Sequence, residues 1–272
     1  MKHIVCLSGG ESSALVAVEV VRKYGPAEVV LLNHDINPSV EDADIKRFKL
    51  EVSQYLKIPI TYANYQDLPG DQLPDQFDVV VKIKAFKVGK GTELCTAKLK
   101  TEPFMNYLKK HFPTKDCIIY YGFDQSELHR VQRRIGIMGG EYGYATAYPL
   151  VHWKRTIQSI RELGIEPPMG YSTFKHANCM GCLKAGKQHW YLVYQHRKDI
   201  FDKGKWAESQ IGYTIDKDES LEELEPKFEE AIRLGLVTTE HEDPRTFWAR
   251  VRKTRINMVP DDGDMKPCEC TL

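Results

Sequence analysis

The stretch KHIVCLSGGESSAL at residues 2–15 sets the fold of this chain. Residues 3–7 form an apolar run that predicts a strand, and Leu15, Val18 and Val21 follow at helical spacing. The glycines between them allow a tight turn, and the start of a helix offers unpaired N–H groups and a positive dipole end. We therefore expect an anion cradle at residues 8–13, formed by Ser8, Gly9, Gly10, Glu11, Ser12 and Ser13.

Short apolar runs alternate with helical patterns up to residue 150. Further strands are expected at residues 28–35, 59–65, 116–123 and 144–150, and an amphipathic helix at residues 41–57. This alternation predicts an α/β fold, a doubly wound parallel sheet with helices on both faces. The long connection at residues 67–90 contains Val79, Val80 and Val81, which indicate a short strand.

From residue 154 onward the pattern becomes mostly helical and contains cysteines. Helices are expected at residues 154–163, 188–200, 221–234 and 244–255, with a break at Pro167 and Pro168. We therefore expect two domains, an α/β domain at residues 1–153 and a helical, cysteine-containing region at residues 154–272.

The charge, the length of the apolar runs and the number of cysteines limit which classes of protein this chain can belong to. The 38 Lys and Arg residues balance 38 Asp and Glu residues, so the net charge does not indicate a nucleic-acid binder. No apolar run approaches the roughly 20 residues of a membrane helix, and the N-terminal run is too short for a signal peptide. Seven cysteines in such a chain indicate metal, cluster or redox chemistry rather than disulfides. These observations predict a cytoplasmic protein without a membrane partner.

Four segments together resemble one family. Residues 8–13, SGGESS, resemble the Ser-Gly-Gly-x-Asp-Ser signature of the PP-loop, adenine nucleotide α-hydrolase-like superfamily. Residues 95–104, 122–130 and 148–182 are similar, in order and spacing, to segments of its sulfonucleotide (PAPS/APS) reductase branch. The matches in these segments include Cys95, Lys100, Gly122, Arg130, Cys179 and Cys182.

The resemblance implies an adenine nucleotide, ATP, PAPS or APS, with its phosphates on the residue 8–13 loop. It places Asn33, His34 and Asp35 near the adenosine, Gly122 beside the nucleotide, and Arg130 or Lys100 at the anionic end. The terminal Cys270 corresponds to the nucleophile of the reductases. Glu11 stands where the family often has Lys, and a carboxylate beside a polyphosphate would require Mg²⁺.

Two close pairs of cysteines indicate a site of their own. Cys179 and Cys182, with Cys268 and Cys270, have the four thiolates of a tetrahedral zinc site or a [4Fe–4S] cluster. Cys95 is the alternative fourth ligand by resemblance to cluster-bearing relatives. A redox pair that brings Cys270 to the nucleotide is the third interpretation.

The sequence therefore predicts a PAPS-reductase-like enzyme that acts on the phosphate or sulfate end of its nucleotide. Two reactions are consistent with this prediction, sulfonucleotide reduction and adenylation with pyrophosphate release. Either reaction can serve in sulfur transfer. Thioredoxin as reductant, tRNA or DNA as acceptor, and a homodimer are the partners considered. The alternatives are a catalytically altered nucleotide-sensing or nucleic-acid-binding accessory protein, suggested by Glu11 and Ser12 in the loop, and a metal-stabilised interaction domain.

Overall fold

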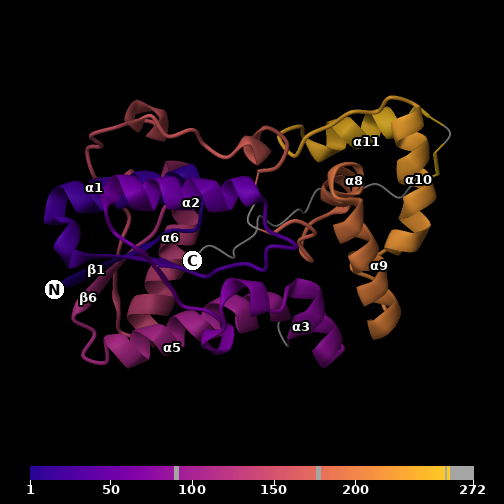
Figure 1. The fold of residues 1–272 in the computed structure, drawn as a ribbon. Coiled ribbons are helices and arrows are strands. Elements are labelled where there is room, and N and C mark those ends of the chain that lie inside the picture. The colour runs from indigo at the N-terminus through magenta and orange to yellow at the C-terminus, as the bar shows by residue number, and fades with distance from the viewer. Residues whose placement is uncertain (89–91, 176–178, 255, 258–272) are drawn as a thin grey trace.

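The computed structural model describes residues 1–88, 92–175, 179–254, 256 and 257. Within these residues, five parallel strands form one sheet in the order β3-β2-β1-β6-β7 (Figure 1). The strands of this sheet are β1 (Lys2–Cys6), β2 (Val29–Asn33), β3 (Ile60–Tyr62), β6 (Cys117–Tyr120) and β7 (Ala145–Ala147). A separate antiparallel pair is formed by β4 (Lys87–Val88) and β5 (Thr92–Glu93).

The helices divide between the sheet and a second, helical region. Those of the first half are α1 (Glu11–Tyr24), α2 (Ala43–Leu56), α3 (Gln76–Ile83), α4 (Leu94–Thr96), α5 (Glu102–His111), α6 (Leu128–Ile135) and α7 (Pro149–His152). The helical lobe contains α8 (Lys187–His196), α9 (Lys198–Ile211), α10 (Leu221–Arg233) and α11 (Pro244–Arg252). No helix among the described residues combines the length and apolar character needed to cross a bilayer.

Helices cover both faces of the sheet, as the sequence predicts. Successive residues of a strand face opposite sides. Val5 and Leu7 accordingly pack with α1 and α2 on one face, whereas Ile4 and Cys6 pack with α5 and α6 on the other. Figure 1 shows α1 and α2 on one side of the strands and α5 on the opposite side. The α/β fold with a parallel sheet is confirmed.

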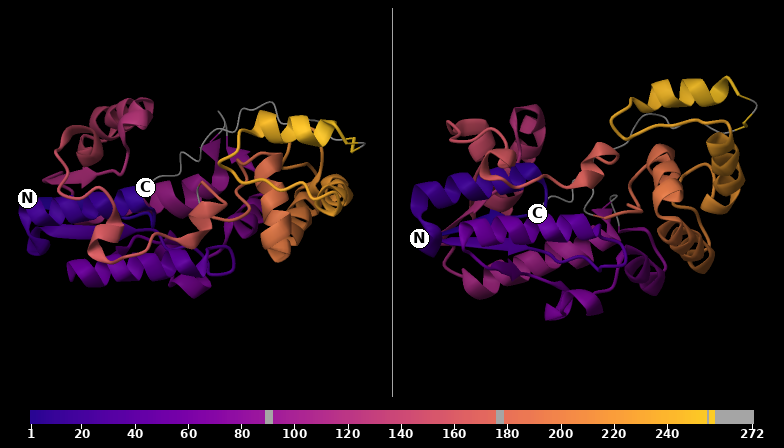
Figure 2. Two further views of the ribbon diagram at one scale, coloured as in Figure 1. Left: turned by 90° about the horizontal axis from the view of Figure 1, so that it is seen from above. Right: turned by 45° about the horizontal axis from the view of Figure 1, so that its top comes forward.

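The helical lobe is built on its own buried cluster, which also takes in residues from the first half of the chain. Val40, Phe77, Val80 and Phe86 are buried in this cluster together with residues of α8 to α11. Figure 2 shows the lobe beside the sheet-bearing half, with α3 next to it. The buried contacts therefore do not divide at residue 153, and the domain boundary placed there stays a prediction.

Residues 79–81 are helical, so the strand predicted there is wrong. They lie in α3, whose first turn is closed by a reciprocal capping box. The Asp75 carboxylate accepts hydrogen bonds from the N–H groups of Phe77 and Asp78 at 2.8 and 3.0 Å, and the Asp78 carboxylate accepts the Asp75 N–H at 3.0 Å. The strand preference of valine depends on its surroundings, and here the cap and the burial of Phe77 and Val80 favour a helix.

The helix predicted over residues 154–163 is also wrong, because only Ile160–Leu163 form a short 3₁₀ turn. Glu19 of α1 accepts the Thr156 N–H at 2.6 Å and the Ile157 N–H at 3.3 Å. The Gln158 and Ser159 N–H groups, which a helix from residue 154 would bond internally, donate instead to the Glu162 carboxylate at 2.7 and 3.0 Å. Residues 154–175, here called the strap, cross from the sheet to the helical lobe along α1 (Figure 2).

Removal of the Asp75 carboxylate should destabilise the protein, because this carboxylate joins α3 to the helical lobe. Asp75 caps α3 and is also paired with Lys203 of α9. We expect Asp75→Ala to lower the free energy of unfolding by roughly 2–4 kcal/mol, because a cap and a buried ion pair are both lost. Asp75→Asn keeps the cap and should be milder. Urea unfolding measures both, with the exposed Asp71→Ala as control; equal stability of Asp75→Ala and the wild type would contradict this assignment.

Candidate functional site

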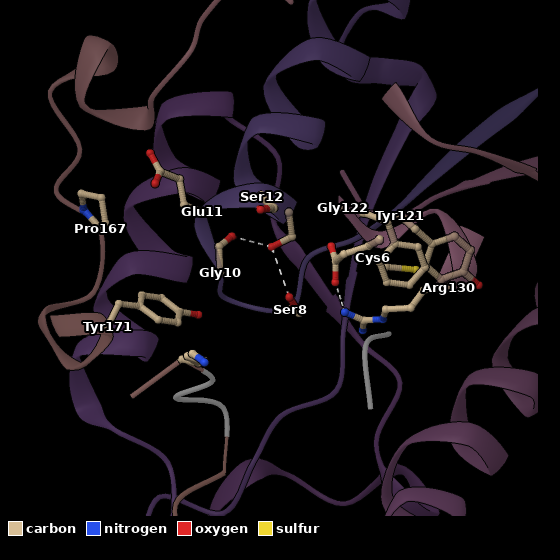
Figure 3. Close-up of a pocket in the computed structure, with 14 residues that line it drawn as sticks. Cys6, Ser8, Gly10, Glu11, Ser12, Tyr121, Gly122, Arg130, Pro167 and Tyr171 are labelled. Carbon is tan, nitrogen blue, oxygen red and sulfur yellow. Dashed lines mark hydrogen bonds and ion pairs between the residues drawn. The ribbon is translucent and has the colours of Figure 1, made fainter. Parts of the chain in front are cut away.

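A cavity lies where the order of the strands reverses. β1 has β2 on one side and β6 on the other, and the helices that follow these strands lie on opposite faces of the sheet. Ligands of open α/β sheets bind at such a switch point, beyond the carboxyl ends of the strands. The cavity there has a volume of about 330 Å³ (Figure 3). It is lined by Cys6, Ser8, Gly10, Glu11, Ser12, Ser13, Tyr121, Gly122, Phe123, Glu127, Arg130, Pro167, Tyr171 and Lys175.

The floor of the cavity is the turn from β1 into α1. Gly10 is the N-cap residue of α1, and no side chain among the described residues caps the helix there. The Ser13 hydroxyl donates to the Gly10 carbonyl oxygen at 2.7 Å, while Ser8 and Ser13 approach each other at 3.4 Å. Gly9 has a φ of +94°, a conformation that favours glycine. The first N–H groups of α1 and two hydroxyls thus face the cavity, as in an anion-binding helix start.

Glu11 is bound away from this floor. Its Oε1 atom accepts the Ser159 hydroxyl at 2.8 Å and the Ile160 N–H at 3.0 Å. Figure 3 shows the carboxylate directed away from Ser8 and Arg130. The negative charge at residue 11 therefore serves to hold the strap on α1.

Two cationic side chains line the cavity. Arg130 of α6 is buried, pairs with Glu127 and lies 4.5 Å from the centroid of the Phe123 ring. Lys175 comes from the strap on the other side, together with Tyr171. In Figure 3 Tyr171 and Arg130 point into the cavity from opposite sides. Burial raises the pKa of the Tyr171 hydroxyl to about 12, so this hydroxyl stays protonated and able to donate a hydrogen bond over the whole neutral and mildly alkaline range.

The polar residues at the end of β2 and directly after it lie outside the cavity lining. Asn33 is buried and donates to the Leu7 carbonyl oxygen at 2.5 Å, and His34 is bound to the carbonyl oxygen of Ala63. Asp35 accepts a hydrogen bond from Lys46 at 3.0 Å. These three side chains hold the ends of strands and α2 together. Lys100, in the turn before α5, also lies outside the lining, and its charge contributes to the low pKa of His34.

The Cys179–Cys182 turn belongs to the helical lobe. The Gln76 side-chain amide donates to the carbonyl oxygens of Met180 and Gly181 at 2.7 and 3.2 Å. His189 accepts the N–H of Cys182 at 3.2 Å. Cys179 and Cys182 are partly buried, as is Cys95, which packs against the lobe's buried cluster.

The metal site proposed for the cysteines is incomplete in the described part of the chain. Cys268 and Cys270 lie outside the described residues. Among the described residues, no group of three or more His, Cys, Asp or Glu side chains could hold a metal ion. The two thiols of the Cys179–Cys182 turn do not make a zinc or cluster site by themselves.

Sequence reasoning found seven of the lining residues and missed the rest. Those it named are Ser8, Gly10, Glu11, Ser12, Ser13, Gly122 and Arg130. Those it missed are Cys6, Tyr121, Phe123, Glu127, Pro167, Tyr171 and Lys175. Tyr121, Phe123 and Glu127 flank residues that it did name, so adjacency was an available signal. The strap residues carried no local signal, because only the fold brings them to the loop.

No protein-family model, curated protein or solved structure matches this chain. The likeness to the PP-loop superfamily therefore stays a prediction from the motifs of the sequence.

Gly122 should tolerate no side chain. A Cβ atom at this position would lie 2.9 Å from the Ser13 nitrogen and 3.0 Å from the Ser12 carbonyl carbon, both backbone atoms. We expect Gly122→Ala to cost roughly 1–3 kcal/mol of unfolding free energy because the helix start must shift. Gly136→Ala is the matched control, since that position has open space and a φ of −58°. Equal stability of the two variants in thermal unfolding would contradict the close approach.

His34 should make stability depend on pH. Burial lowers the pKa of its ring from 6.5 to about 4, so the folded state keeps it neutral. As the pH falls below 6.5 the unfolded state takes up a proton that the folded state does not. Folding should therefore weaken between pH 6.5 and 4, by up to about 3 kcal/mol from this residue.

His34→Asn should remove that part of the pH dependence while keeping a donor near the Ala63 carbonyl oxygen. Urea unfolding of both proteins from pH 7.5 to 4.5 checks this. Parallel stability profiles for the two proteins would show that His34 does not titrate as described.

Proposed function

We propose that this chain binds an adenine nucleotide on the residue 8–13 loop and acts on its phosphate or sulfate end, as a PAPS-reductase-like enzyme. One observation carries the proposal. A single cavity at the switch point of the sheet combines the open N-terminus of α1 with two cations, Arg130 and Lys175. Such a set of donors binds a phosphate or sulfate group.

The charges of the cavity suit an anionic ligand. Glu11 lines the cavity, but its carboxylate is bound to the strap and is directed away from the floor. Glu127 neutralises Arg130 in the absence of ligand, and an incoming anion would compete with this carboxylate. Phe123 and Tyr171 add aromatic surface of the kind on which an adenine ring stacks.

The described residues explain binding and orientation better than covalent chemistry. Cys6 lines the cavity, yet burial raises the pKa of its thiol to about 12, so it is protonated at neutral pH and is a poor nucleophile. Ser8 and Ser13 donate and orient. The group that attacks the nucleotide would then come from an acceptor, or from Cys270 outside the described residues.

Arg130 and Glu127 should have opposite effects on affinity. Arg130→Gln removes a charged donor and should weaken binding of the nucleotide by roughly ten- to a hundredfold, the value of a hydrogen bond to a charged group. Glu127→Gln releases the guanidinium from a carboxylate and should tighten binding by about two- to fivefold. Calorimetric titration measures both. Arg133→Gln, the same change on the exposed side of α6, is the control.

Two assays separate the reactions that remain open. Pyrophosphate release from ATP would indicate adenylation, and sulfite release from PAPS or APS with thioredoxin would indicate reduction. The proposal fails if ATP, PAPS and APS all fail to bind at millimolar concentration, or if Arg130→Gln and Arg133→Gln bind equally well.

A further inference from the structure

Residues 240 and 241 of the helical lobe bind three alternate residues of the strap. The Glu240 N–H donates to the Thr173 carbonyl oxygen at 2.8 Å, and the Lys175 N–H donates to Glu240 Oε2 at 2.6 Å. The His241 Nε2–H donates to the Tyr171 carbonyl oxygen at 2.6 Å. Two of these three strap residues, Tyr171 and Lys175, line the cavity.

The same carboxylate is fixed from its other side by a histidine. Glu240 Oε1 faces Nδ1 of His189, and both side chains are almost fully buried, at 4% and 3% exposed. Because His189 Nε2 accepts the Cys182 N–H, the ring proton is assigned to Nδ1, which donates to Glu240. The ring of Phe174 packs edge-on against His189 at 5.7 Å between centroids.

These contacts fix the backbone of Lys175, and therefore the position from which its side chain extends. Phe174 is buried in the lobe, and Lys175, next in sequence, is exposed toward the cavity. Glu240 accepts the Lys175 N–H, and His241 donates to the Tyr171 carbonyl oxygen. Residues 240 and 241 of the lobe therefore fix the backbone of both strap residues, Tyr171 and Lys175, that line this side of the cavity.

We propose that Glu240 is a positioning residue for the nucleotide cavity: it sets the affinity for the ligand's anionic end through Lys175, although it does not line the cavity itself. The ligand class rests on the proposed function; the positioning of the strap does not. A carboxylate is required because it offers two acceptor atoms, one to His189 and one to Lys175. A carboxamide has one acceptor oxygen and can satisfy one of these donors.

The first test is a double-mutant cycle on binding of ATP and of APS. Glu240→Gln should weaken binding by about two- to tenfold, the factor that one hydrogen bond is worth. In a Lys175→Gln background the same change should not weaken binding further, because the charged side chain through which Glu240 acts is already absent. Glu242→Gln is the matched control, since Glu242 pairs with Arg250 in the same loop. Equal losses in both backgrounds, or an equal loss in Glu242→Gln, would overturn the proposal.

The second test needs no nucleotide. Hydrogen exchange of the peptide covering residues 169–175 should be faster in Glu240→Gln than in the wild type and in Glu242→Gln, with exchange of residues 8–13 unchanged. Unchanged protection of residues 169–175 would overturn the positioning role of Glu240, whether or not a nucleotide binds. If this peptide exchanges faster but neither ATP nor APS binds the wild type, the positioning role stands and the proposed function fails.

Discussion

The arrangement of this protein depends on the close approach of the start of α1 to the end of β6. Gly122 lies so near the backbone of Ser12 and Ser13 that a methyl group would not fit between them. This contact brings the first N–H groups of α1 over the point where the order of the strands reverses. Since Arg130 lies in the first turn of α6, which follows β6 and Gly122 in the chain, the same contact places a cation beside those donors. The floor and one wall of the cavity therefore have a single geometric origin.

The opposite wall has a different origin, in carboxylates of α1 and α2 that bind the strap. Glu11 and Glu19 accept its backbone donors on one side. Asp44 accepts the Met169 N–H at 2.7 Å, and Arg47 donates to the Glu166 carbonyl oxygen at 3.0 Å. The strap is thus bound to both helices of one sheet face before it enters the helical lobe. Because Glu11 has a structural partner in the strap, its presence does not argue against an anion on the floor.

Local patterns predicted the sheet because period and burial agree within each strand: β2, β3, β6 and β7 lie inside their predicted ranges, and β1 (Lys2–Cys6) begins one residue before its predicted range of 3–7. The loop at residues 8–13 was predictable for the same reason, since its residues are adjacent. Two elements were wrong because a cap or a distant acceptor outweighed local propensity, at α3 and at residues 154–159. Tyr171 and Lys175 could not be foreseen, because they reach the loop through contacts with Asp44 and Glu240 that are far away in sequence.

The shared buried cluster has a consequence for the order in which the chain can fold during synthesis. Phe77 and Val80 are covered by side chains of α8 to α11, which are made more than a hundred residues later. Until then α3 has an apolar face without its native partner, whereas the β1–α1–β2 unit can pack at once. Contacts of such long separation form slowly and leave apolar surface open to association with other chains. The emerging protein should therefore depend on chaperones at α3 until α11 has left the ribosome.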